Sequence, residues 1–88
     1  MINMRTRIQE LQNQWNRNKG KDVVLVLWMD MGDVAPKPEV IINPYLNIQA
    51  KVEYIGRVYT PDLVLKANSD IKIDRFAFVE KDAVSHIL

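Results

Sequence analysis

The strongest feature of the hydrophobic pattern is an unbroken apolar run at residues 23–29, bounded by Asp22 and Asp30. The run holds three valines and a tryptophan but no glycine or proline. Its short length and its β-branched residues favour a strand over a helix. Successive side chains of a strand point to opposite faces, and both faces of this one are apolar. The pattern therefore predicts a central strand at about 22–31 that needs cover on both faces.

The segment before this strand has the period of an amphipathic helix. Met4, Ile8, Leu11 and Trp15 are spaced i, i+4, i+7 and i+11 among polar residues, which places them on one stripe. We expect a helix at 3–18, with Asn3 as N-cap and Gly20 just beyond its C-terminal end. Its apolar stripe is then the expected cover for one face of the central strand.

Four further strands are expected, at about 39–42, 46–55, 58–67 and 71–79. Apolar and polar residues alternate through 46–55, which is typical of a strand with one face in water. The pair Gly56-Arg57 suits a two-residue type II′ turn, which would place Tyr54 opposite Tyr59 in a hairpin. Pro61 removes a ladder donor, so its strand should be an edge or bend there.

The last strand changes phase partway along its length. Ile71 and Ile73 are at odd positions, whereas Phe76 and Phe78 are at even ones. A β-bulge at Asp74-Arg75 would bring both sets to the same face and would let the sheet bend. Residues 81–88 then form a short tail, with room for one helical turn.

Together these elements predict the α+β class in a single domain over residues 1–88. The N-terminal helix packs on a curved, mostly antiparallel sheet of about five strands, because the connections are short. One helix covers only one face of the central strand. The other face must be covered either by the sheet curling into a small, partly open barrel or by another subunit.

Composition narrows the function classes. The chain has no cysteine, which removes disulfides and thiolate chemistry, and its net charge is only +1. Five basic residues and only Glu10 among the acids give residues 1–21 a net charge of +4. No apolar signal-peptide core follows the start, and no apolar run approaches the roughly 20 residues of a membrane span. We expect a cytoplasmic protein without membrane contact.

Candidate catalytic and metal-binding groups are sparse. The one histidine, His86, adjoins Ser85, and adjacency in sequence does not make their side chains converge. Asp30 and Asp33 flank Gly32 but lack the further ligands of a calcium loop, and acids at the end of a strand are ordinary. We therefore predict no enzyme activity, no metal and no cofactor.

Two interaction surfaces can be predicted. Nucleic acid binding would use basic groups together with the Tyr54/Tyr59 hairpin as a stacking pair. Its candidate contacts are Arg5, Arg7, Arg17, Lys19, Lys21, Tyr54, Arg57 and Tyr59. Self-association would instead use Val24, Val26, Trp28, Ile87 and Leu88. A tyrosine pair of this kind also commonly serves only to stabilise a hairpin.

Arg5 and Arg7 are unusual because they lie in the first helical turn, where the helix dipole favours acids. Either solvent screens their charges or they bind an anion.

A helix followed by about five bent strands is similar in layout to Sm-like proteins, which form rings and bind RNA, and to OB-type barrels. Residues 43–47 only faintly match the first Sm motif, and the Arg-Gly pair of the second is absent, so no family is assigned.

The predicted function is that of a small non-enzymatic binding or assembly module. We expect it to form homo-oligomers and to act through contacts with a protein whose identity the sequence does not specify. The alternative is a module that binds RNA or single-stranded DNA.

Overall fold

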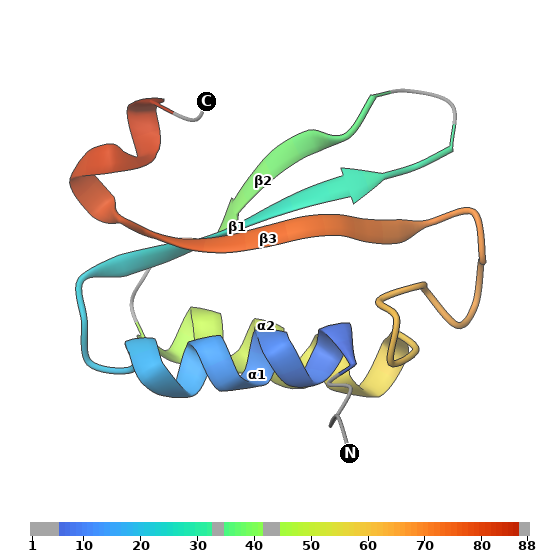
Figure 1. The fold of residues 1–88 in the computed structure, drawn as a ribbon, viewed down its shortest axis with the longest axis horizontal. Coiled ribbons are helices and arrows are strands. Elements are labelled where there is room, and N and C mark those ends of the chain that lie inside the picture. The colour runs from blue at the N-terminus through green and yellow to red at the C-terminus, as the bar shows by residue number, and fades with distance from the viewer. Residues whose placement is uncertain (1–5, 33–34, 42–44, 87–88) are drawn as a thin grey trace, which may run out of the picture.

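The computed structural model describes residues 6–32, 35–41 and 45–86. The elements, in chain order, are α1 (Arg7–Asn18), β1 (Val23–Asp30), β2 (Lys37–Ile41), α2 (Tyr45–Val58), β3 (Lys72–Glu80) and the 3-10 helix η1 (Lys81–His86). The strands form an antiparallel sheet in the order β2-β1-β3, and α1 and α2 lie together against one of its faces (Figure 1). The α+β class and the N-terminal helix are confirmed. The described sheet is open and has three strands, so the predicted five strands and barrel are not.

Helix α1 begins at Arg7, later than the predicted start at residue 3. Thr6 is the N-cap in a capping box with Gln9, which satisfies two first-turn amides. The amide of Ile8 donates to the carbonyl of Pro61 at 3.0 Å. The predicted cap Asn3 lies outside the described residues. Gly20 has a φ of +83°, the left-handed conformation predicted for the residue after this helix.

The central position of β1 is confirmed, since it pairs with β2 on one side and β3 on the other. Leu25 and Leu27 belong to the hydrophobic core that also contains Leu11 and Trp15 of α1. The alternate residues Val24 and Val26 therefore point to the opposite face of the sheet.

The prediction of strands at 46–55 and 58–67, joined by a turn at Gly56-Arg57, is wrong. Residues 45–58 form α2, and its buried side chains are spaced i, i+4 and i+7 at Ile48, Val52 and Ile55. The alternation of apolar and polar residues did not distinguish a strand from a helix here, because the apolar positions from Leu46 to Tyr54 fit a period of two as well as a period of 3.6. The burial of both Val52 and Ile55, with Tyr54 between them 44% exposed, decides for the helix, because a strand would direct Val52 and Ile55 to opposite faces.

The chain between α2 and β3 is a compact turn region. Thr60 accepts from the amide of Leu63 across Pro61 and Asp62, and Leu63 has a φ of +65°, a strained conformation for a branched residue. Leu63 is fully buried and its carbonyl accepts from the amide of Ile73 at 2.9 Å. Burial and this hydrogen bond offset the strain of order 1–3 kcal/mol.

The bulge predicted in the last strand is confirmed. In the β1–β3 ladder Trp28 pairs with Arg75 and Met29 pairs with Ile73, so that Asp74 is the extra residue. Ile73, Phe76 and Phe78 accordingly all pack against the helix-side core. The predicted strand at 39–42 corresponds to β2, and the predicted helical turn in the tail corresponds to η1. Ile87 and Leu88 lie outside the described residues.

Replacing Gly56 with alanine tests the helical assignment of α2. A Cβ at this position would lie 3.5 Å from Gln12 Nε2, an ordinary contact, and Gly56 does not have a positive φ. Glycine in a helix interior costs about 0.5–1 kcal/mol relative to alanine. We expect Gly56→Ala to raise the free energy of unfolding by up to that amount in urea denaturation. A loss of stability would instead indicate a turn that requires glycine.

Trp15 anchors α1 to the sheet and to α2. It is 3% exposed, its ring stacks on Phe78 at a centroid distance of 5.9 Å, and its Nε1 donates to Gln49 Oε1 at 2.6 Å. We expect Trp15→Ala to lower the free energy of unfolding by about 3–5 kcal/mol. The exposed neighbour Asn16→Ala is the control, with an expected change within about 0.5 kcal/mol. Similar losses for the two variants would contradict the anchoring role.

Candidate interaction surface

The face of the sheet that points away from α1 and α2 is here called the outer face. Cross-strand partners share a face, so the register assigns its members by row. Val24 pairs with Val79, Val26 with Val40 and Ala77, and Trp28 with Pro38 and Arg75. The outer face consists of Val24, Val26, Trp28, Pro38, Val40, Arg75, Ala77 and Val79, with the paired Asp30 and Lys72 at the end beyond Trp28.

Arg75 lies among the valine and tryptophan rows of the outer face, and the ion pair of Asp30 and Lys72 forms the charged end of this face beyond Trp28. Antiparallel sheets with one face packed on a core usually place polar side chains on the other, and this sheet does not. Val24 is 2% exposed and Val26 is fully buried, whereas Trp28, Val40 and Val79 remain partly exposed around them. The outer face therefore combines a buried apolar centre with partly exposed apolar neighbours.

Helix η1 covers one end of the outer face. It follows β3 directly, turns to the side of the sheet opposite α1 and α2, and lies against β1 and β3 (Figure 1). Its Ala83 and Val84 are partly buried there. Because η1 follows Glu80, which pairs with Val23, it lies at the Val24 end and away from Trp28.

Trp28 and Arg75 form a cation–π pair at the other end of the outer face. The guanidinium carbon of Arg75 lies 4.0 Å from the centroid of the Trp28 ring. Such contacts contribute about 0.5–1 kcal/mol at exposed sites and more when water is excluded. Tryptophan and arginine are also the residue types that most often dominate the energetics of protein interfaces.

The structure places the described members of the predicted nucleic acid contacts at several points of the helical layer. Arg17 forms an ion pair with Glu10 at 3.7 Å, and Lys19 lies over the ring of Trp15 at 5.9 Å. Helices α1 and α2 run antiparallel, so Lys19 and Arg57, each near the C-terminal end of its helix, line a shared hollow from its two ends (Figure 1). Lys21 follows α1 at the Lys19 end, and Arg5 lies outside the described residues.

The prediction that Tyr54 and Tyr59 form a hairpin pair is wrong, because Tyr54 belongs to α2 and Tyr59 to the turn that follows it. Tyr54 is exposed, with Lys51 Nζ at 5.4 Å from its ring, whereas Tyr59 is 8% exposed and packs in the core. Burial, with smaller contributions from Tyr54 and Glu39, raises the pKa of Tyr59 above its ordinary value. Tyr59 is thus a core residue that is unable to stack on a base.

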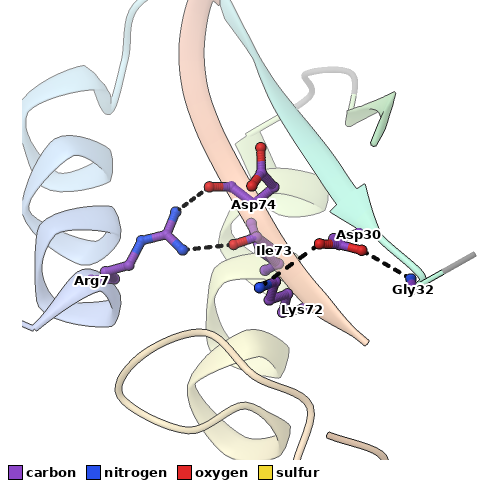
Figure 2. Close-up of polar contacts among 6 residues, drawn as sticks. All are labelled: Arg7, Asp30, Gly32, Lys72, Ile73 and Asp74. Atoms are coloured by element: carbon purple, nitrogen blue, oxygen red, sulfur yellow. Dashed lines mark hydrogen bonds and ion pairs between the residues drawn. The ribbon is translucent and has the colours of Figure 1, made fainter. Parts of the chain in front are cut away.

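Arg7 has a structural contact that sequence reasoning missed. Figure 2 shows its guanidinium reaching from α1 to the bulge of β3, where Nη1 donates to the carbonyl of Ile73 at 2.8 Å and Nη2 to that of Asp74 at 2.7 Å. The guanidinium fork suits two adjacent acceptors of this kind. The predicted bulge, set beside a cation at an unfavourable helix position, was the available signal for this contact.

Asp30, the candidate oxygen ligand, is engaged by the chain itself. Its Oδ1 accepts from the amide of Gly32 at 2.9 Å, and its Oδ2 lies 3.8 Å from Lys72 Nζ (Figure 2). Asp33 lies outside the described residues. Within residues 6–32, 35–41 and 45–86, no three histidine or acidic side chains gather in a way that could hold a metal ion. In the same ranges, no helix has the length and apolar character needed to cross a membrane.

Arg7 should therefore stabilise the fold despite its position at the positive end of the α1 dipole. Hydrogen bonds to a charged donor contribute about 1.5–3 kcal/mol, against a dipole cost of about 0.3–1 kcal/mol. We expect Arg7→Gln to lower the free energy of unfolding by about 1–2 kcal/mol in urea denaturation. The matched control is Arg17→Gln, which removes an exposed ion pair and should change stability by less than about 0.5 kcal/mol. A stabilised Arg7→Gln variant would contradict this role.

Comparison with known proteins adds no functional assignment: no protein-family model, no curated protein and no solved structure matches this chain.

Proposed function

We propose that this chain is a small non-enzymatic assembly module that self-associates and acts through protein–protein contacts made by its outer face. The observation that carries the proposal is the apolar character of that face. Trp28, Val40 and Val79 are each partly exposed around a buried valine centre. Removing their remaining surface from water would contribute about 25 cal/mol for each Å² of apolar area.

The open end of the outer face has the composition of an interface centre. Trp28 and Arg75 are already in contact, so little side-chain freedom remains to be lost when a partner covers them. Pro38, directly opposite Trp28 on β2, adds a further apolar group that is rigid before binding. These three residues are the expected centre of the contact.

The exposed part of the outer face limits what one copy can bind alone. Val24 and Val26 are already buried and η1 covers the Val24 end, so the accessible apolar surface is confined to the partly exposed side chains around them. A stable interface buries about 800 Å² of accessible surface on each partner. A single face is therefore expected to bind weakly unless copies combine.

Light scattering across micromolar concentrations tests the proposal. We expect a mean mass above the 10.2 kDa of one chain. Trp28→Glu should lower that mass, because it places a carboxylate on the apolar face while keeping an opposite-charge partner in Arg75 for the folded sheet. Circular dichroism checks that the variant is folded.

The matched control is Tyr54→Glu, which changes an exposed aromatic residue on the helical side of the molecule. It should leave the mass unchanged. A monomeric wild type throughout the concentration range, or equal effects of the two variants, would contradict the proposed function.

A further inference from the structure

The outer edge of β3 carries backbone groups that point away from the sheet. Lys81 N donates to the carbonyl of Asp22 at 3.2 Å, just beyond the pair Val23–Glu80, and this bond sets the phase of the β1–β3 ladder. Hydrogen-bonded and non-hydrogen-bonded pairs alternate in an antiparallel ladder. Ala77 therefore bonds to β1, whereas the N–H and C=O groups of Phe76 and Phe78 point outward.

The chain closes one part of this edge and leaves the rest open. Ile73 N donates to Leu63, and Arg7 occupies the carbonyls of Ile73 and Asp74. Beyond Asp74, no hydrogen bond between described residues uses the outward groups of Phe76 or Phe78. The strand ends at Glu80, so the open segment is residues 75–79, with Ala77 at its centre.

The opposite edge of the sheet is protected in the usual ways. β2 has only five residues, and Pro38 removes the N–H that would point outward, between residues that bond to β1. The open segment of β3 has no proline and holds Arg75, two phenylalanines, an alanine and a valine, and its one charged group lies over the ring of Trp28 on the outer face. Its geometry is that of a strand ready to pair with another strand.

We propose that a second copy of this chain pairs antiparallel with the open edge of β3, with the two-fold axis of the dimer at Ala77. This inference rests on the proposed self-association and names where the two copies meet. The register follows from the symmetry of the open segment about Ala77. Phe76 then lies opposite the partner's Phe78 and exchanges backbone hydrogen bonds with it, an aromatic pairing that stabilises sheets.

The flank of α1 provides the charge complementarity that selects a second copy as the partner. α1 packs beneath β3, and Arg7, Glu10, Gln14 and Arg17 form one stripe that begins at the Arg7 contact with β3. The stripe carries both signs of charge, with the side chain of Glu10 37% exposed and that of Arg17 60% exposed. A two-fold axis at Ala77 places this stripe beside the same stripe of the partner, running antiparallel.

The positions of residues along α1, compared with those along β3, agree with a two-fold axis at Ala77. Arg7 is level with the bulge at Ile73 and Asp74, whereas Asn18 lines a hollow with Phe78 and Glu80 at the other end. The middle of α1, near residues 13 and 14, is therefore level with Ala77. That is also the midpoint between Glu10 and Arg17, so each Glu10 faces the partner's Arg17.

Edge pairing would also enlarge the outer face. Two sheets joined at β3 would form one continuous six-stranded sheet with the four α-helices on one side. The shared outer face would then offer twice the partly exposed apolar surface of one copy. Dimerisation through the edge would thus build a larger face for the proposed contacts.

Charge exchange between copies tests the inference in the Trp28→Glu background, where the outer face contributes least. We expect that variant to retain twice the mass of one chain. Adding Arg17→Glu or Glu10→Arg should each weaken dimerisation about tenfold, because like charges then meet across the axis twice. An equimolar mixture of the two should restore the dimer, since opposite charges then meet between copies.

The design separates contacts between copies from contacts within one. Each variant has like charges at positions 10 and 17 of its own chain, so a dimer restored in the mixture owes its opposite-charge pairs only to contacts between copies. Arg57→Glu, with the same charge change on α2, is the control and should leave the dimer intact. Circular dichroism confirms that each exposed substitution leaves the fold unchanged.

Two results would overturn edge pairing while leaving self-association in place. One is a Trp28→Glu variant that is already monomeric although the wild type associates. The other is a Trp28→Glu dimer that is insensitive to the changes at Glu10 and Arg17, or is not restored by the mixture. A monomeric wild type would remove the proposed function together with this inference.

Discussion

The structure depends on the need to cover both apolar faces of β1. Residues 23–29 bring apolar side chains to each face, and leaving either in water forfeits about 1.5–3 kcal/mol for each large side chain. The helix-side face is covered by α1 and α2, which together bury Leu25 and Leu27 completely. Among the described residues, the outer face has no second layer of comparable size, since η1 covers only one end of it. The outer face is therefore the less completely covered of the two faces of β1.

The bulge at Asp74 makes the helix-side cover possible. Without the extra residue, Ile73 and Phe76 would point to opposite faces, because an odd separation changes the face of a strand. With it, Ile73, Phe76 and Phe78 all join the core, and Phe78 stacks on Trp15. The unpaired carbonyls at the bulge are satisfied by Arg7, which links the start of α1 to the same point. Helix, bulge and core are therefore held by one contact region.

The two edges of the sheet are treated differently by the chain. β2 is short, and Pro38 leaves it without a backbone N–H at a position where that group would point outward. The start of β3 is closed by Leu63 and Arg7, yet the outward backbone groups of Phe76 and Phe78, above the mixed charges of α1, have no hydrogen-bond partner among the described residues. In Figure 1 this edge of β3, with α1 beneath it, lies in front of β1 and α2. The edge of β3 and the outer face adjoin at Ala77 and Val79.

The sequence alone determined the elements whose pattern allowed one interpretation. The seven-residue apolar run predicted a central strand, the Leu11–Trp15 stripe predicted α1, and the change of phase between Ile73 and Phe76 predicted the bulge. Each of these patterns fits only one period.

Only the tertiary structure decided the segment 45–59, because its apolar residues fit both the strand and the helix period. Packing of Ile48, Val52 and Ile55 against α1 and β1 favoured the helix, and no local signal at Gly56 could have shown it. The same error produced the false Tyr54/Tyr59 pair. The contact of Arg7 with the bulge likewise joins residues more than 60 positions apart. Such contacts depend on how the layers pack, which a local pattern of side chains does not encode.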